Sequence, residues 1–159
     1  MTLFYNNRML AERAFIVCAC AARLSCYMEN GKYSAEMREI MTVELISVGT
    51  EILLGNIVNT NAAWLSEQCA RLGLSCYYQS VVGDNAVRLK EQIQQALNRS
   101  DIVILTGGLG PTTDDLTKET AAQLMGKGLV MDMHSLERVE AYFKARRIEM
   151  TENNKKQAL

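Results

Sequence analysis

The sequence lacks a strong charge of either sign. It holds 17 Lys and Arg against 18 Asp and Glu, a formal net charge of -1. Binding to nucleic acid usually needs clustered excess basic residues, so we expect no nucleic-acid partner. The basic pairs Arg146-Arg147 and Lys155-Lys156 are predicted to be solvated helix ends. Any phosphate ligand is therefore expected to be held by backbone N–H groups and a metal.

The cysteine and histidine content also gives little support for disulfides, a zinc site or a catalytic triad. The five cysteines are odd in number and form no CxxC pair, which argues against a disulfide framework or a zinc site. Cys69 and Cys76 are predicted to be small buried apolar residues, and this usage fits a reducing, cytoplasmic compartment. The single histidine, His134, leaves no case for a Ser-His-Asp or Cys-His arrangement.

Long apolar runs are missing as well. The longest spans residues 14–22 and ends at Arg23, which is too short to cross a bilayer, so no membrane partner is expected. A secretory signal is the alternative interpretation of this run. It is disfavoured by Glu12 and by two cysteines, and no clean cleavage site follows.

What the sequence does contain is the composition of a globular domain, with 48% apolar and 22% charged residues. A regular pattern begins at Met41. Residues 1–40 show no clear period and are predicted to be a poorly ordered or short helical extension that is not native, with Met41 as the authentic start. Residues 41–159 are predicted to form the domain.

Within residues 41–159, strand-like and helix-like segments alternate. Strands are predicted over 43–48, 75–82 and 101–105, the last a continuous apolar run typical of a buried parallel strand. Helices are predicted over 61–72, 86–97, 116–125, 135–146 and 151–158. This alternation predicts an α/β fold with a mostly parallel sheet covered on both sides.

Ligands in such sheets bind beyond the carboxyl ends of the strands. The loops expected there are residues 49–61, 83–85 and 106–115, and all three are rich in Gly, Asp, Asn and Thr. The last is the most informative. Gly107, Gly108 and Gly110 permit positive φ and close approach of a ligand, so that successive N–H groups can hold an anion.

Hydroxyl donors at Thr106, Thr112 and Thr113 add to this cradle, and Pro111, the only proline, stiffens it. The loop is neither GxGxxG nor a Walker loop. The alternative interpretation is a plain strand-to-helix connection in which glycine merely makes the turn.

Acidic side chains lie next to the predicted anion cradle. Asp114 and Asp115 should repel phosphate unless a cation lies between them, which points to Mg²⁺ or a similar hard ion. Helix capping is the alternative. Asp84, after the second strand, is expected to ligate metal or to hydrogen-bond a ribose or ring amide, with a local turn as the alternative.

The remaining candidates are polar residues of the neighbouring loops. Glu51, Asn59 and Asn61 could contact the edge of a base or pterin. Thr117 and Glu119 fall in the first turn of the helix after the glycine loop. For all five, helix capping is the competing interpretation.

Three motifs in order resemble a known family. GTEILLGNIVNTNAA at 49–63, VGDN at 82–85 and TGGLGPTTDD at 106–115 look like the N-terminal domain of the competence/damage-inducible protein A (CinA) family, part of the molybdopterin-binding (MoCF biosynthesis) superfamily. The resemblance covers residues 41–159. It implies a three-layer α/β/α fold, commonly a homo-oligomer, and a metal-dependent ADP-ribose pyrophosphatase that releases AMP and ribose 5-phosphate.

The resemblance also implies roles for particular residues. Gly107, Gly108 and Gly110 would cradle the pyrophosphate. Asp115 and Asp84 match functional aspartates and would act in catalysis. Thr117 and Glu119 match the continuation of the loop motif. The divalent metal, Mg²⁺ or alternatively Co²⁺ or Mn²⁺, would be held by Asp115 and Asp114.

Two departures from the family pattern matter. Residues 1–40 lie outside it, and the chain stops at 159 where family members continue, so the domain is expected to be incomplete at its C-terminus. The alternatives left open are a module that binds a nucleotide or pterin phosphate without turnover, a molybdopterin adenylyltransferase-like activity, and an inactive fragment.

Overall fold

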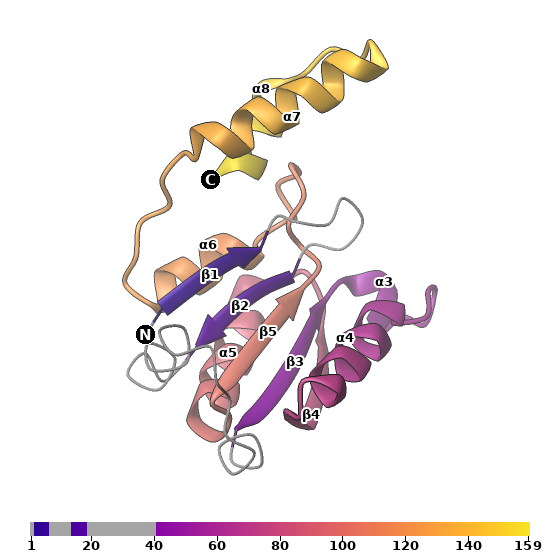
Figure 1. Ribbon diagram of the computed structural model, residues 1–159, viewed down its shortest axis with the longest axis vertical. Coiled ribbons are helices and arrows are strands. Elements are labelled where there is room, and N and C mark those ends of the chain that lie inside the picture. The colour runs from indigo at the N-terminus through magenta and orange to yellow at the C-terminus, as the bar shows by residue number, and fades with distance from the viewer. Residues whose placement is uncertain (1, 7–13, 19–40) are drawn as a thin grey trace.

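The fold is built on a five-stranded sheet with the order β1-β2-β5-β3-β4. The computed structural model describes residues 2–6, 14–18 and 41–159, and Figure 1 shows their arrangement. The strands are β1 (Thr2–Asn6), β2 (Ala14–Cys18), β3 (Thr42–Val48), β4 (Ser75–Val82) and β5 (Ile102–Thr106). The three strands predicted from the sequence are confirmed.

Strand β3 lies between β5 and β4 and runs parallel to both. Val43 pairs with Ile102 of β5, and Val48 pairs with Val82 of β4. All three strands therefore end at the same edge of the sheet, where the predicted ligand loops follow.

Strands β1 and β2 form an antiparallel pair that extends the sheet beside β5. The prediction of a poorly ordered or helical segment over residues 1–40 is wrong for these two stretches. Strand β2 pairs with the otherwise free edge of β5, and β1 pairs with β2. The rest of that range lies outside the described residues.

Helices cover both faces of the sheet, which confirms the three-layer α/β/α prediction (Figure 1). Helix α4 (Thr60–Arg71) lies on one face, and α5 (Ala86–Arg99) and α6 (Thr117–Leu124) lie on the other. The short α3 (Thr50–Leu53) was not predicted. The chain ends in α7 (Met133–Arg146), α8 (Glu152–Lys155) and the 3-10 turn η1 (Lys156–Ala158).

Alternating side chains of β3 divide the core between the two faces. Ile46 and Val48 pack with Leu89 and Ile93 of α5. On the other face, Val43 and Leu45 pack with the small residues Ala62 and Cys69 of α4. Burial raises the pKa of the Cys69 thiol, as expected for a packing residue.

Two large apolar residues of the segment predicted as a helix over 61–72 lie at the surface. Trp64 is 38% exposed and Leu72 is 63% exposed. The face turned to the sheet carries Ala62, Leu65 and Cys69. Leu72 is the C-cap residue, just beyond the last residue of α4.

Helix α7 lies apart from the sheet in Figure 1, and η1 packs against it. The backbone N–H of Asp132 donates to the carbonyl of Ala158 at 2.8 Å, which ties the start of α7 to the final turn. None of the helices that the structure describes is both long and apolar enough to cross a membrane.

Candidate functional site

The backbone of the glycine loop has a conformation that residues with a Cβ atom rarely adopt. Gly107 has φ +89° and Gly108 has φ +59°, both in the left-handed region. A Cβ atom at Gly107 would lie 2.0 Å from the carbonyl oxygen of Val48, at the end of β3. The glycine here is required by close backbone packing between the β3 and β5 ends.

Thr117 anchors the loop from the first residue of α6. Its hydroxyl donates to the carbonyl of Gly107 at 2.8 Å, and its N–H donates to the carbonyl of Gly108 at 3.1 Å. The side chain is fully buried. Thr117 therefore holds the loop in place from α6, and its hydroxyl hydrogen is already used in the bond to Gly107.

Asp115 folds back onto its own loop. Its Oδ2 accepts from the N–H of Thr112 at 2.9 Å and from the Thr112 hydroxyl at 2.5 Å. Burial acts to raise the pKa of Asp115, but hydrogen bonds from Thr112 and the Gly110 backbone, and the charge of Lys156, outweigh it and hold the pKa below its usual value. The carboxylate is thus kept ionised and already uses some of the loop donors.

Two amides of the first loop connect the ends of β3 and β5. Asn59 caps α4 by accepting from the N–H of Ala62 at 3.1 Å, and its amide donates to Ser47 at 2.9 Å. The Asn61 amide donates to the Thr106 hydroxyl at 3.2 Å. Asn59 therefore has the predicted capping role, and Asn61 lies beside the glycine loop.

Asp84 belongs to a separate cluster at the end of β4. Its Oδ2 accepts from the N–H of Thr50 at 3.0 Å and from the Thr50 hydroxyl at 2.7 Å. The cap of α5 is Asn85, not Asp84. The Glu51 carboxylate lies against Gly49, since a Cβ there would come 2.6 Å from its Oε1. Asp84 follows β4 and Asp115 follows β5, with β3 between these strands, and no hydrogen bond or ion pair in the described chain joins the two aspartates.

One lysine that sequence reasoning did not assign to the site, Lys156, contacts the glycine loop, and a second, Lys118, contacts Lys156. The buried Lys118 donates to the carbonyl of Lys156 at 2.5 Å. Lys156 in turn donates to the carbonyl of Thr112 at 3.0 Å and to that of Asp115. The prediction that Lys156 is a solvated helix end is therefore wrong. Nothing local signals its role, because 44 positions separate it from Thr112.

The described residues do not supply a complete set of ligands for a metal ion. Within the described residues, no three His, Cys, Asp or Glu side chains gather into a metal site. Mg²⁺ commonly binds through one or two carboxylates together with substrate phosphates and waters. In that mode Asp114 and Asp115 would be the carboxylates, and the substrate phosphates would supply further ligands.

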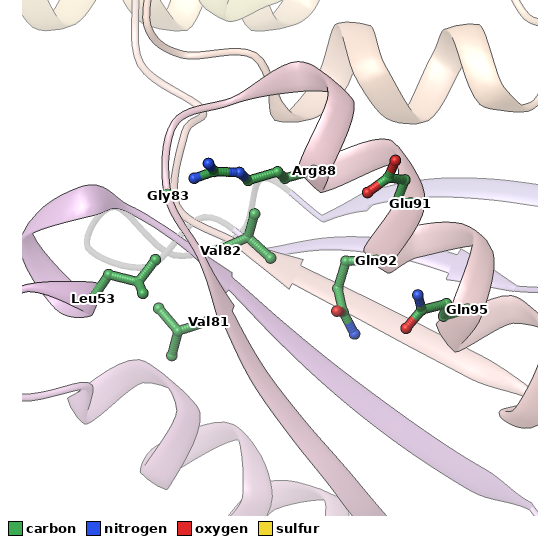
Figure 2. Close-up of a pocket in the computed structure, with 8 residues that line it drawn as sticks. All are labelled: Leu53, Val81, Val82, Gly83, Arg88, Glu91, Gln92 and Gln95. Atoms are coloured by element: carbon green, nitrogen blue, oxygen red, sulfur yellow. The ribbon is translucent and has the colours of Figure 1, made fainter.

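A pocket of about 320 Å³ has no residue of the glycine loop in its lining; Figure 2 shows the residues that line it. It opens between α5 and the ends of α3 and β4, next to the Asp84 cluster, and Arg88, Gln92 and Leu53 are among its lining residues. This pocket is therefore on the β4 side, whereas the glycine loop follows β5.

Comparison with known proteins gives a consistent result. The family model described as "Probable molybdopterin binding domain" matches residues 44–157. A competence-damage inducible protein of Alkaliphilus oremlandii is 55% identical over 117 residues, covering 74% of this chain and 28% of that protein. A protein of the same name from Geobacillus kaustophilus is 56% identical over 119 residues, covering 75% of this chain and 29% of the relative.

Among solved structures, the crystal structure of the protein CinA, of unknown function, from Thermoplasma acidophilum matches with a TM-score of 0.64 and 35% identity. The match covers 74% of this chain and 68% of that one. The chain spans less than a third of the length of the curated relatives it matches.

Proposed function

The chain belongs to the molybdopterin-binding (MoCF biosynthesis) domain family, and on that premise we propose that it hydrolyses a nucleotide pyrophosphate with a divalent metal, ADP-ribose being the substrate. The observation that carries the proposal is the loop over residues 107–115. Positive φ at Gly107 and Gly108, after β5, permits successive loop N–H groups to converge on one anion, and the pKa of the neighbouring Asp115 is lowered.

In this proposal, water attacks one phosphorus of the pyrophosphate and a P–O bond of the anhydride breaks, giving AMP and ribose 5-phosphate. Loop N–H groups and the Thr113 hydroxyl bind the phosphoryl oxygens and stabilise the charge that develops on them. Asp115 and Asp114 hold the metal, which would neutralise phosphate charge and activate water when bound. The exposed Asp84 binds the sugar or a water from the β4 side.

Release of AMP from ADP-ribose tests this proposal, with Mg²⁺, Mn²⁺ or Co²⁺ added in turn. Asp115→Asn is the informative variant, because an amide oxygen can still accept from Thr112 while the negative charge is lost. Metal-dependent release that this variant loses is expected. Asp132→Asn, the same change at the cap of α7, is the control and should keep full activity.

If Asp115→Asn turns over at the wild-type rate, Asp115 has no catalytic role and the proposed mechanism fails. If the folded wild type releases no AMP with any of the three metals, the proposed hydrolysis fails as well.

One observation favours a second candidate, a module that binds a nucleotide or pterin phosphate without turnover. The carboxylate of Asp115 already accepts from Thr112 and Gly110, so it is partly committed to shaping the loop. Tight binding of AMP by calorimetry with no product from ADP-ribose would favour this candidate. AMP transfer to molybdopterin would instead indicate the adenylyltransferase-like alternative.

The family premise also carries a proposal of a homo-oligomer. Four apolar side chains in and after α3 are strongly exposed: Leu53, Leu54, Ile57 and Val58. Exposed apolar residues close together are typical of an interface. Light scattering after gel filtration should give a mass of two or more chains of 17.8 kDa each. A monomer at high concentration would contradict the proposed oligomer.

A further inference from the structure

The C-terminal turn η1 lies against the glycine loop, although 41 positions separate Lys156 from Asp115. Lys118 of α6 fixes this turn, since its ammonium group donates to the carbonyls of Lys156 and Leu159 at 2.5 and 3.3 Å. Lys118 is only 2% exposed. A buried ammonium that donates to carbonyls of another segment holds that segment firmly, because leaving the charge unpaired is costly.

The side chain of Lys156 then reaches the loop. Its ammonium donates to the Thr112 carbonyl at 3.0 Å and to the Asp115 carbonyl, and it lies 3.3 Å from Oε1 of Glu119. Only 22% of the side chain is exposed. Lys156 therefore holds the carbonyl side of the turn over residues 112–115, which fixes where the Asp115 carboxylate lies.

The charge of Lys156 matters because the surroundings are acidic. Asp114, Asp115 and Glu119 carry three negative charges within and just after the loop. A second oxygen of Glu119, Oε2, is buried and has no hydrogen-bond donor within the described residues. An incoming pyrophosphate would meet this acidic group, and a fixed cation offsets part of the repulsion.

We propose that Lys156 is a positioning residue of the glycine-loop site, supplied by the C-terminal turn, which fixes the 112–115 turn and makes it able to accept a pyrophosphate group. This inference rests on the proposed function and extends it to a residue outside the recognised motifs. The site is thus composed of three segments: the loop after β5, the first turn of α6, and η1.

Calorimetric titration of the full chain with inorganic pyrophosphate tests this inference without requiring turnover. Lys156→Met is expected to weaken binding on the order of tenfold, the typical effect of losing a charged hydrogen-bonding group. Lys156→Arg, which keeps the charge and donors, should recover most of the affinity. Lys155→Met is the matched control, because Lys155 pairs only with Glu152 at the surface and should bind as the wild type does.

Lys156→Gln guards against simple unfolding, since its amide can still donate to a carbonyl while lacking the charge. It should fold as the wild type does by circular dichroism and still bind pyrophosphate more weakly by several fold.

A folded Lys156→Gln or Lys156→Met variant that binds within twofold of the wild type overturns the inference, as does a wild type that binds no pyrophosphate. A wild type that binds pyrophosphate through Lys156 yet releases no AMP would reject the proposed hydrolysis alone and leave this inference supported.

Discussion

Replacing Gly107 by alanine separates the effect of backbone geometry on the loop from that of its polar side chains. A left-handed φ costs an L-residue about 1–2 kcal/mol. The new Cβ would also lie 2.0 Å from the carbonyl oxygen of Val48, and such overpacking costs about 1–3 kcal/mol more. We therefore expect the free energy of unfolding to fall by about 2–5 kcal/mol.

Two other glycines provide matched controls for this prediction. Gly126 also has a positive φ of +62°, but nothing lies within 4 Å of its Cβ position, so alanine there should cost only about 1–2 kcal/mol. Gly128 has open space and no such φ, and its alanine variant should stay within about 0.5 kcal/mol of the wild type.

Urea unfolding followed by circular dichroism measures all three variants. A loss of about 3 kcal/mol for Gly107→Ala would correspond to a Tm lower by roughly 10 °C. The order of destabilisation should be 107, then 126, then 128. A Gly107→Ala variant as stable as Gly126→Ala would refute the claim that the β3 and β5 ends pack too closely for a side chain.

Three further predictions concern the core, a helix cap and pH. Ile93→Ala should lower the free energy of unfolding by about 2–5 kcal/mol in urea, because Ile93 is fully buried between α5 and the sheet; an effect below 1 kcal/mol would contradict the packing described. Asn85→Ala should cost about 1 kcal/mol by the same measurement, since Asn85 accepts from the N–H of Arg88 at the start of α5, whereas Asn85→Asp should be nearly neutral. The pKa of Asp115 is lower in the folded chain than its usual 3.8, so its stabilising contribution is present above pH 3.8 and is lost as the pH falls through the folded value. Unfolding free energies of wild type and Asp115→Asn measured between pH 6 and pH 2 should therefore converge toward the acid end; a constant difference would be inconsistent with that shift.

Much of the fold was predictable because apolar residues in residues 41–159 recur at the spacings typical of strands and helices. The continuous apolar run over β5 predicts a buried strand. The spacing of Leu89 and Ile93 predicts a helix, α5, with these two residues on its buried face. Strands β1 and β2 were missed, since their pairing depends on a free edge of β5 that no local pattern reveals.

The site was predictable to the extent that it is local. The glycine loop and its position after a buried strand follow from sequence, because positive φ and strand polarity are local properties. The contacts between distant segments do not. Neither the bond from Asn61 to Thr106 nor the reach of Lys156 to the loop has a signal in sequence spacing, since both depend on how the elements pack.

The central claim, that the glycine loop binds the phosphates of a nucleotide, is tested most directly by titrating labelled protein with ADP-ribose and following its amide resonances. The largest shifts are predicted at Gly107, Gly108 and Gly110, and they should be strengthened by Mg²⁺. Shifts confined to the pocket between α5 and β4, around Gly83, Arg88 and Gln92, would contradict the account and place the ligand on the other side of β3.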